Sequence, residues 1–133
     1  KLVSFIRCIF NIAFYRERDY IKEAFTIYLK VMAVGTDKLR AALRKVVDPE
    51  VGINIVDLGL VYAIAQDEHG VTVDLTMTSP ACPMGESIVA EAEYELAAVL
   101  PTSLSVAVNL VWDPPWSPAL MSDRARETLG WEA

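Results

Sequence analysis

Two runs of strand-forming residues joined by a polar turn constrain the fold more than any other feature. Residues 59–66 and 71–77 are rich in Val, Leu, Ile, Tyr and Thr, and residues 67–70 supply the polar side chains and glycine of a hairpin turn. In the second run apolar and polar side chains alternate, which is typical of a sheet with one buried face. We therefore expect two antiparallel strands.

A helix is predicted before this hairpin. Thr36 is a candidate N-cap, and Asp48-Pro49 stops the helix. Between them one apolar face is formed by Leu39, Leu43, Val46 and Val47.

A second helix and a third strand are predicted after the hairpin. Cys82-Pro83 opens a helix that runs to about Leu100, since proline is tolerated in a first helical turn. Alternation over residues 104–110 predicts the third strand, and a last helix is expected over roughly 119–129. The expected class is α+β: a small sheet of about three strands packed against helices.

The chain divides into an extension and a body. Its 133 residues suffice for one domain with its own core. Residues 1–31 are apolar with approximate helical spacing, so we expect an N-terminal helical extension, and residues 32–133 then form the domain. The extension is either a docking helix or sequence foreign to the domain. A cleaved signal peptide is not expected, because no small-x-small site follows.

Charge is distributed unevenly between these two parts. Residues 1–31 hold six Lys/Arg and three Asp/Glu, and residues 32–133 hold six and fifteen, which add to the totals of 12 and 18. A body of net charge −9 argues against nucleic-acid binding. Basic side chains at helical spacing are interpreted as a solvated face, namely Lys38, Arg40, Arg44 and Lys45.

No apolar run approaches the roughly 18 residues of a membrane span. We therefore expect no membrane span and a cytoplasmic protein. The two cysteines, Cys8 and Cys82, lie far apart in different settings, so a disulfide framework is not expected.

Cys82 is the main candidate for chemistry. It follows a strand and a Thr-Ser-Pro-Ala turn and stands at the expected positive end of a helix dipole, where a thiolate is stabilised. Such a sulfur binds soft metals or attacks electrophiles. The alternative, a small packed cysteine, is about equally well supported by these local signals.

Asp57 and Thr78 are candidate supporting residues. Asp57 precedes the first strand of the hairpin, so its carboxylate is expected at the sheet end from which Cys82 emerges. A turn or cap role is the alternative for Asp57, and the Thr78 hydroxyl either faces Cys82 or satisfies its own loop.

Two further features bear on function. His69 is the only histidine and lies in the predicted turn, which argues against a Cys–His dyad with Cys82. Trp112 and Trp116 bracket a proline-rich segment and, with Met121, form a candidate partner surface. Packing of the last helix onto the sheet is the alternative for these three side chains.

Several motifs in order resemble a known family. They are Asp48-Pro49-Glu50, residues 57–62 (DLGLVY), residues 78–83 (TSPACP), residues 112–116 (WDPPW), Met121-Ser122 and Leu129-Gly130. Over about residues 36–131 this set is similar to the iron–sulfur cluster assembly factors that include SufT and PaaD. The resemblance implies an iron–sulfur assembly domain-like fold, with the family's motif cysteine, aspartate and threonine at Cys82, Asp57 and Thr78.

The resemblance also implies a function without turnover chemistry. Members help to mature iron–sulfur proteins or deliver clusters to them, so a transient cluster or iron and client or assembly proteins are the expected cofactor and partners. A cluster needs about four ligands, so metal bound at Cys82 must be shared with a homodimer partner, a client or a small thiol. The rival hypotheses are a thiol-dependent enzyme or redox protein with Cys82 as nucleophile, and a purely scaffolding domain.

Overall fold

The computed structural model describes residues 20–26, 29 and 34–131. Within the predicted extension, residues 20–26 are helical and their side chains are exposed. The part of the predicted helical extension before residue 20 lies outside the described residues, and so does Cys8. Among the described helices, none is long and apolar enough to cross a membrane.

Three strands form the central sheet, in the order β3-β4-β5. β3 (Val61–Gln66) and β4 (Gly70–Leu75) are antiparallel, which confirms the predicted hairpin. β5 (Ser105–Leu110) is parallel to β4, in register from Gly70 opposite Ser105 to Leu75 opposite Leu110. Parallel neighbours need a long crossover, and the helix α3 (Gly85–Val99) provides it.

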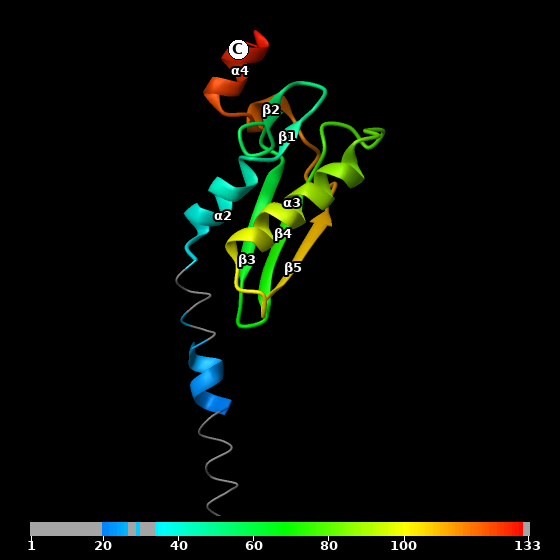
Figure 1. Ribbon diagram of the computed structural model, residues 1–133. Coiled ribbons are helices and arrows are strands. Elements are labelled where there is room, and N and C mark those ends of the chain that lie inside the picture. The colour runs from blue at the N-terminus through cyan, green and yellow to red at the C-terminus, as the bar shows by residue number, and fades with distance from the viewer. Residues whose placement is uncertain (1–19, 27–28, 30–33, 132–133) are drawn as a thin grey trace, which may run out of the picture.

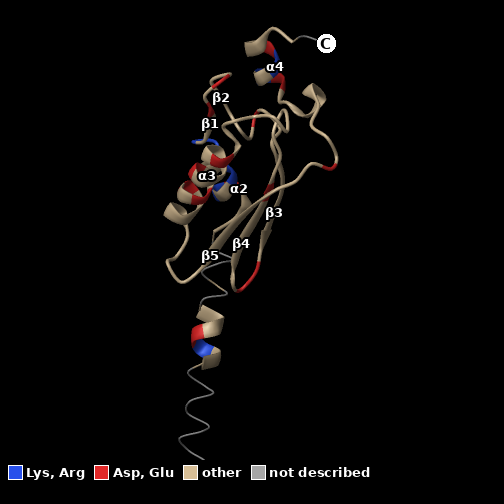
Figure 2. Ribbon diagram, turned by 90° about the vertical axis from the view of Figure 1, so that its right-hand side faces the viewer, with Lys and Arg blue, Asp and Glu red and all other residues tan. Residues whose placement is uncertain are grey.

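Two helices, α2 (Thr36–Leu43) and α3, cover one face of this sheet, as the side view of Figure 2 shows. The predicted N-cap was wrong by one residue: Gly35 is the N-cap, and Thr36 is the first helical residue. α2 also ends at Leu43, earlier than predicted. The chain then forms a two-stranded antiparallel hairpin of β1 (Val47–Asp48) and β2 (Ile53–Asn54), whose strands are too short to show a sequence period.

The core lies between the helices and the sheet. Alternate β4 residues Val71, Val73 and Leu75 are at most 2% exposed, as the sequence pattern predicted. They pack in one cluster with apolar residues of both helices, namely Leu39 and Leu43 of α2 and Ile88, Ala92 and Leu96 of α3. Burying each large aliphatic side chain stabilises the fold by about 1.5–3 kcal/mol. Helices packed on one face of a small mixed sheet confirm the α+β class.

The C-terminal segment lies beyond one end of the sheet, near β1 and β2 (Figure 1). The predicted last helix is divided into a 3-10 helix, η1 (Pro118–Leu120), and α4 (Asp123–Leu129), because Met121 between them has an extended backbone. The Ser122 hydroxyl accepts a hydrogen bond from the Ala125 N–H and caps α4. The helix ends at Gly130, whose φ of 68° is left-handed.

Candidate functional site

Cys82 lies in the loop that joins β4 to α3. Its N–H donates a 3.1 Å hydrogen bond to the Ser79 carbonyl, and the Ser79 hydroxyl accepts a hydrogen bond from the Ala81 N–H. These contacts, with Pro80 and Pro83, hold the segment in successive turns. The thiol is free, partly buried and packed against the core.

The predicted start of the second helix was wrong. α3 begins at Gly85 with Met84 as its N-cap, so Cys82 and Pro83 precede the helix. Two turn residues, Pro83 and Met84, separate Cys82 from the first helical residue. Since the field of a helix dipole falls off within its first turn, the dipole argument for this thiol is weaker than the sequence indicated.

Thr78 shares the loop with Cys82 and is exposed. Among the described residues, no hydrogen bond joins its hydroxyl, or the carboxylate of Asp57, to the thiol of Cys82. Thr78 and Cys82 thus share one loop without a hydrogen bond between their side chains, while Asp57 is held by Asn54.

Asp57 is anchored in the turn between β2 and β3. Its Oδ2 accepts a 2.7 Å hydrogen bond from Asn54 Nδ2, and its N–H donates a 2.9 Å hydrogen bond to Asn54 Oδ1. Its carbonyl accepts a 2.8 Å hydrogen bond from the Ser122 N–H, which links the turn to α4. Asp57 thus has the turn role that the sequence left open, and one carboxylate oxygen remains without a protein donor among the described residues.

The side chain of Asp57 also lines a pocket that the sequence did not predict. Arg44, Asn54, Arg124 and Thr128 contribute to its wall, and Cys82 and Thr78 do not. Arg44 was interpreted as part of a solvated face, and Arg124 carried no motif. Only the packing of α4 against β1 and β2 reveals their common pocket, so no local sequence signal could have found it.

The three side chains of the predicted partner surface have different environments. Met121 is 4% exposed and belongs to the core, so for this residue the packing alternative holds. Trp116 is half-buried, and its Nε1 donates a 2.8 Å hydrogen bond to the Leu58 carbonyl. Trp112 is 45% exposed and is the one of the three that presents a large apolar surface to solvent.

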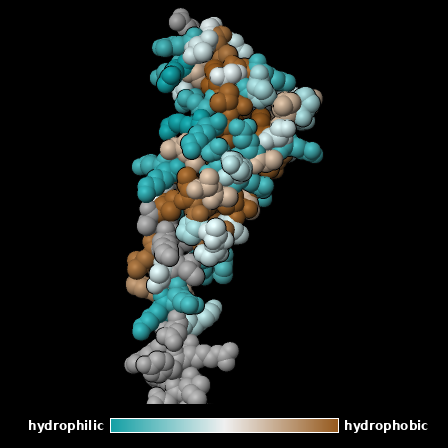
Figure 3. Space-filling view, in the orientation of Figure 1, coloured by the Kyte–Doolittle hydropathy of each residue, from teal (hydrophilic) through white to brown (hydrophobic). Residues whose placement is uncertain are grey.

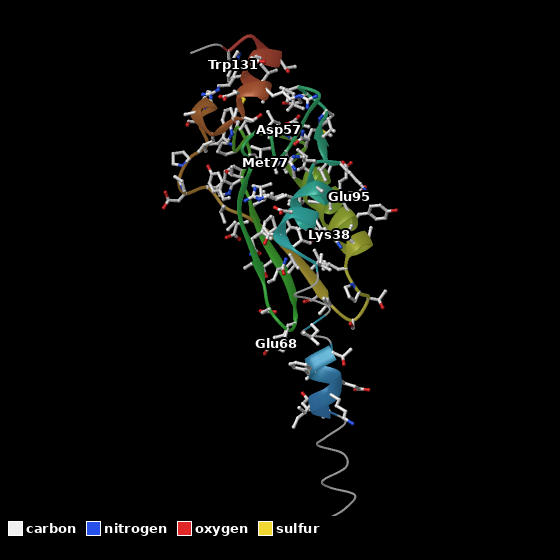
Figure 4. All side chains as sticks on the ribbon, turned by 90° about the vertical axis from the view of Figure 1, so that its left-hand side faces the viewer. Lys38, Asp57, Glu68, Met77, Glu95 and Trp131 are labelled. Carbon is white, nitrogen blue, oxygen red and sulfur yellow. The ribbon has the colours of Figure 1, made fainter. Side chains whose placement is uncertain are left out.

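His69 occupies the β3–β4 turn, as predicted, with its side chain 83% exposed. Glu68, the neighbouring turn residue, lies at the end of the sheet opposite Asp57 in Figure 4. Within the described residues no three His, Cys, Asp or Glu side chains are grouped so as to hold a metal ion. A cluster would therefore need ligands beyond those that this part of the chain provides.

Comparison with known families gives a match over residues 36–110, to a family described as iron-sulfur cluster assembly protein. The chain belongs to this family. The matched residues include Asp57, Thr78 and Cys82, and they end before Trp112 and α4. The predicted resemblance to SufT-like factors is confirmed.

Individual relatives agree with this assignment. The chain is 49% identical to the Fe-S protein maturation auxiliary factor SufT of Staphylococcus aureus over 64% of this chain and 97% of the relative. It is 44% identical to the Fe-S protein maturation auxiliary factor YitW of Bacillus subtilis, over 71% of this chain and 92% of the relative. A solved DUF59 domain from Bacillus anthracis has 43% identity and a TM-score of 0.67, covering 72% of this chain and 92% of the domain.

Proposed function

We propose that the protein is an accessory factor that assists iron–sulfur cluster assembly or delivers clusters to client proteins, with Cys82 as its working thiol. The observation that carries the proposal is family membership over the segment that contains Cys82, together with the position of this free, partly buried thiol in a loop. Relatives at 44–49% identity are named as maturation auxiliary factors.

The cluster or iron is cargo in this proposal, bound transiently and shared. Thiolate sulfur is the usual ligand of iron–sulfur clusters, and Cys82 is the thiol that the described residues offer. A second copy of the chain, a client or a small thiol would supply the remaining ligands. Thr78 and Asp57 are proposed as supporting residues: Thr78 lies on the same loop as Cys82, and Asp57 lies within the same family-matched segment.

A thiol-dependent enzyme is the weaker alternative. A nucleophilic cysteine needs a base within hydrogen-bond reach. His69 lies in the turn before β4, and Cys82 follows the opposite end of that strand. This arrangement favours a non-catalytic role.

Client and assembly proteins are the proposed partners, and Trp112 is a proposed contact. Its exposed ring follows β5, an edge strand of the sheet, and large aromatic side chains are common anchors at interfaces. On the face shown in Figure 3, hydrophilic surface is interrupted by hydrophobic patches.

The proposal is tested by replacing the thiol. Cys82→Ser is expected to abolish the maturation of iron–sulfur client enzymes in cells that depend on this protein. The denaturation midpoint of the purified variant should stay near the wild-type value. Serine is close to cysteine in size and shape, so the packing of this partly buried loop position should be largely kept. Ser87→Ala, at an exposed position on α3, is the matched control and should retain client activity. Normal client activity in Cys82→Ser, together with a large loss of stability, would assign the cysteine to packing alone.

A further inference from the structure

A pocket of about 260 Å³ lies where α4 meets the end of α2 and the β1–β2 hairpin. Its apolar wall is formed by Val47, Ile53 and Ala125. Polar residues complete the lining, namely Arg44, Arg124, Asp57, Asn54 and Thr128. The volume is just below the roughly 300–1,000 Å³ of pockets for drug-sized ligands, so the pocket suits a smaller molecule.

The two arginines give this pocket a charge opposite to that of the surrounding domain. Residues 32–133 carry six Lys/Arg against fifteen Asp/Glu, yet two of those six cations line this one pocket. Figure 2 shows Lys and Arg on α4 and near the end of α2. Among the described residues, the ion pairs use other side chains, namely Lys45, His69 and Arg126. Neither Arg44 nor Arg124 forms an ion pair with another described residue.

The carboxylate of Asp57 makes no direct ion pair with these arginines. It forms no ion pair with Arg44 or Arg124, and its Oδ2 is occupied by the amide of Asn54. Its other oxygen can accept a hydrogen bond from a ligand, since an ionised carboxylate accepts at both oxygens. The pocket thus combines donors for an oxyanion with one acceptor for a hydroxyl or amino group.

We propose that this pocket binds a small organic oxyanion, a carboxylate or a phosphate ester, that also carries a hydroxyl or amino donor. Arginine presents a planar fork of N–H groups that matches carboxylate and phosphate oxygens. Asp57 selects for the donor group, and the apolar wall contacts the carbon skeleton. The pocket is lined by α4, which lies outside the residues matched by the family model.

Calorimetric titration of the full chain tests this binding, with L-malate, O-phospho-L-serine and inorganic phosphate as probes and L-serine as a control, at fixed ionic strength. At least one organic probe is expected to bind saturably at one site and to shift the backbone amide resonances of Arg44 and Gly52. Malate binding alone identifies a carboxylate ligand, and binding of phosphoserine but of neither malate nor L-serine identifies a phosphate ester.

Charge-removing variants locate the site. Arg44→Gln and Arg124→Gln should each weaken binding about tenfold or more, as expected for the loss of charged hydrogen bonds. Lys38→Gln removes an equal charge from α2 outside the pocket and should change affinity by less than about twofold, because exposed distant charges are screened. Cys82→Ser should bind as the wild type does, which separates this site from the proposed function.

Three results would overturn the proposal. The first is absence of saturable binding by either organic probe. The second is equal weakening in Lys38→Gln and Arg124→Gln, which would indicate non-specific attraction. The third is binding of inorganic phosphate as tightly as the organic probes, which would remove the role given to Asp57.

Discussion

The indole Nε1 of Trp116 donates a 2.8 Å hydrogen bond to the backbone carbonyl of Leu58. The next residue, Gly59, has a φ of 73° and lies so close to η1 that an added Cβ would come within 2.3 Å of the Leu120 carbonyl oxygen. The proline-rich segment is thus joined to the turn before β3 by a side-chain hydrogen bond and a tight backbone approach.

This approach predicts a large effect of Gly59→Ala. The change should lower the free energy of unfolding by about 2–5 kcal/mol, since left-handed backbone strain and overpacking add together. Gly52→Ala is the matched control, because Gly52 has a φ of 71° but no heavy atom within 4 Å of the added Cβ. It should cost only about 1–2 kcal/mol. Urea denaturation of both variants measures the difference, and equal losses would show that the contact with Leu120 is unimportant.

A fragment of residues 32–133 is expected to unfold cooperatively, with a midpoint near that of the full chain. The buried cluster is drawn from α2, the sheet, α3 and the C-terminal segment, all of which the fragment contains. A shorter fragment, residues 32–110, is the comparison. It lacks Met121 and Ala125, which are 4% and 1% exposed, and should be much less stable. A molten 32–133 fragment would show that residues 1–31 belong to the core.

Stability should fall in acid partly through Asp67. Backbone N–H groups of His69 and Gly70 donate to its carboxylate at 2.8 and 3.0 Å and lower its pKa below the ordinary value. Because the pKa is lower in the folded state, the contribution is complete above the unfolded-state pKa and is lost as pH falls through the folded-state pKa. Asp67→Asn keeps an acceptor oxygen but removes the charge.

The wild type should therefore be more stable than Asp67→Asn at neutral pH, and the difference should shrink below about pH 4. Urea denaturation at a series of pH values measures it. A difference that stays constant from neutral to acid pH would contradict this origin.

Any iron–sulfur cluster reconstituted on the protein without oxygen should be labile and should involve more than one chain or an added thiol. Ligand counting is the reason, since a cluster needs about four ligands and the described residues contain one free cysteine. Native mass spectrometry with iron and sulfide analysis measures the stoichiometry. A stable cluster on one monomer without added thiol, retained in Cys82→Ser, would contradict the proposed site.

Local periodicity was sufficient to predict much of the fold. Alternating side chains predicted the β3–β4 hairpin, the strand β5 and the buried face of β4. This alternation can be seen in the sequence because successive side chains of a strand point to opposite faces of the sheet. Helix ends were less well predicted. Thr36 and Pro83 are typical start signals, but the N-caps of the two helices are Gly35 and Met84.

Local sequence signals gave Cys82, Thr78 and Asp57 as candidates, and the family motif gave the same three, so the sequence determined the kind of protein this is. Their surroundings depend on tertiary structure: Asp57 is held by Asn54 and by the backbone before α4, and Met121 is buried although its sequence context also allowed a surface. Arg44 and Arg124 are eighty positions apart in the sequence and line one pocket only because α4 packs against β1 and β2. Contacts between distant segments leave no local period, so the fold alone decided them.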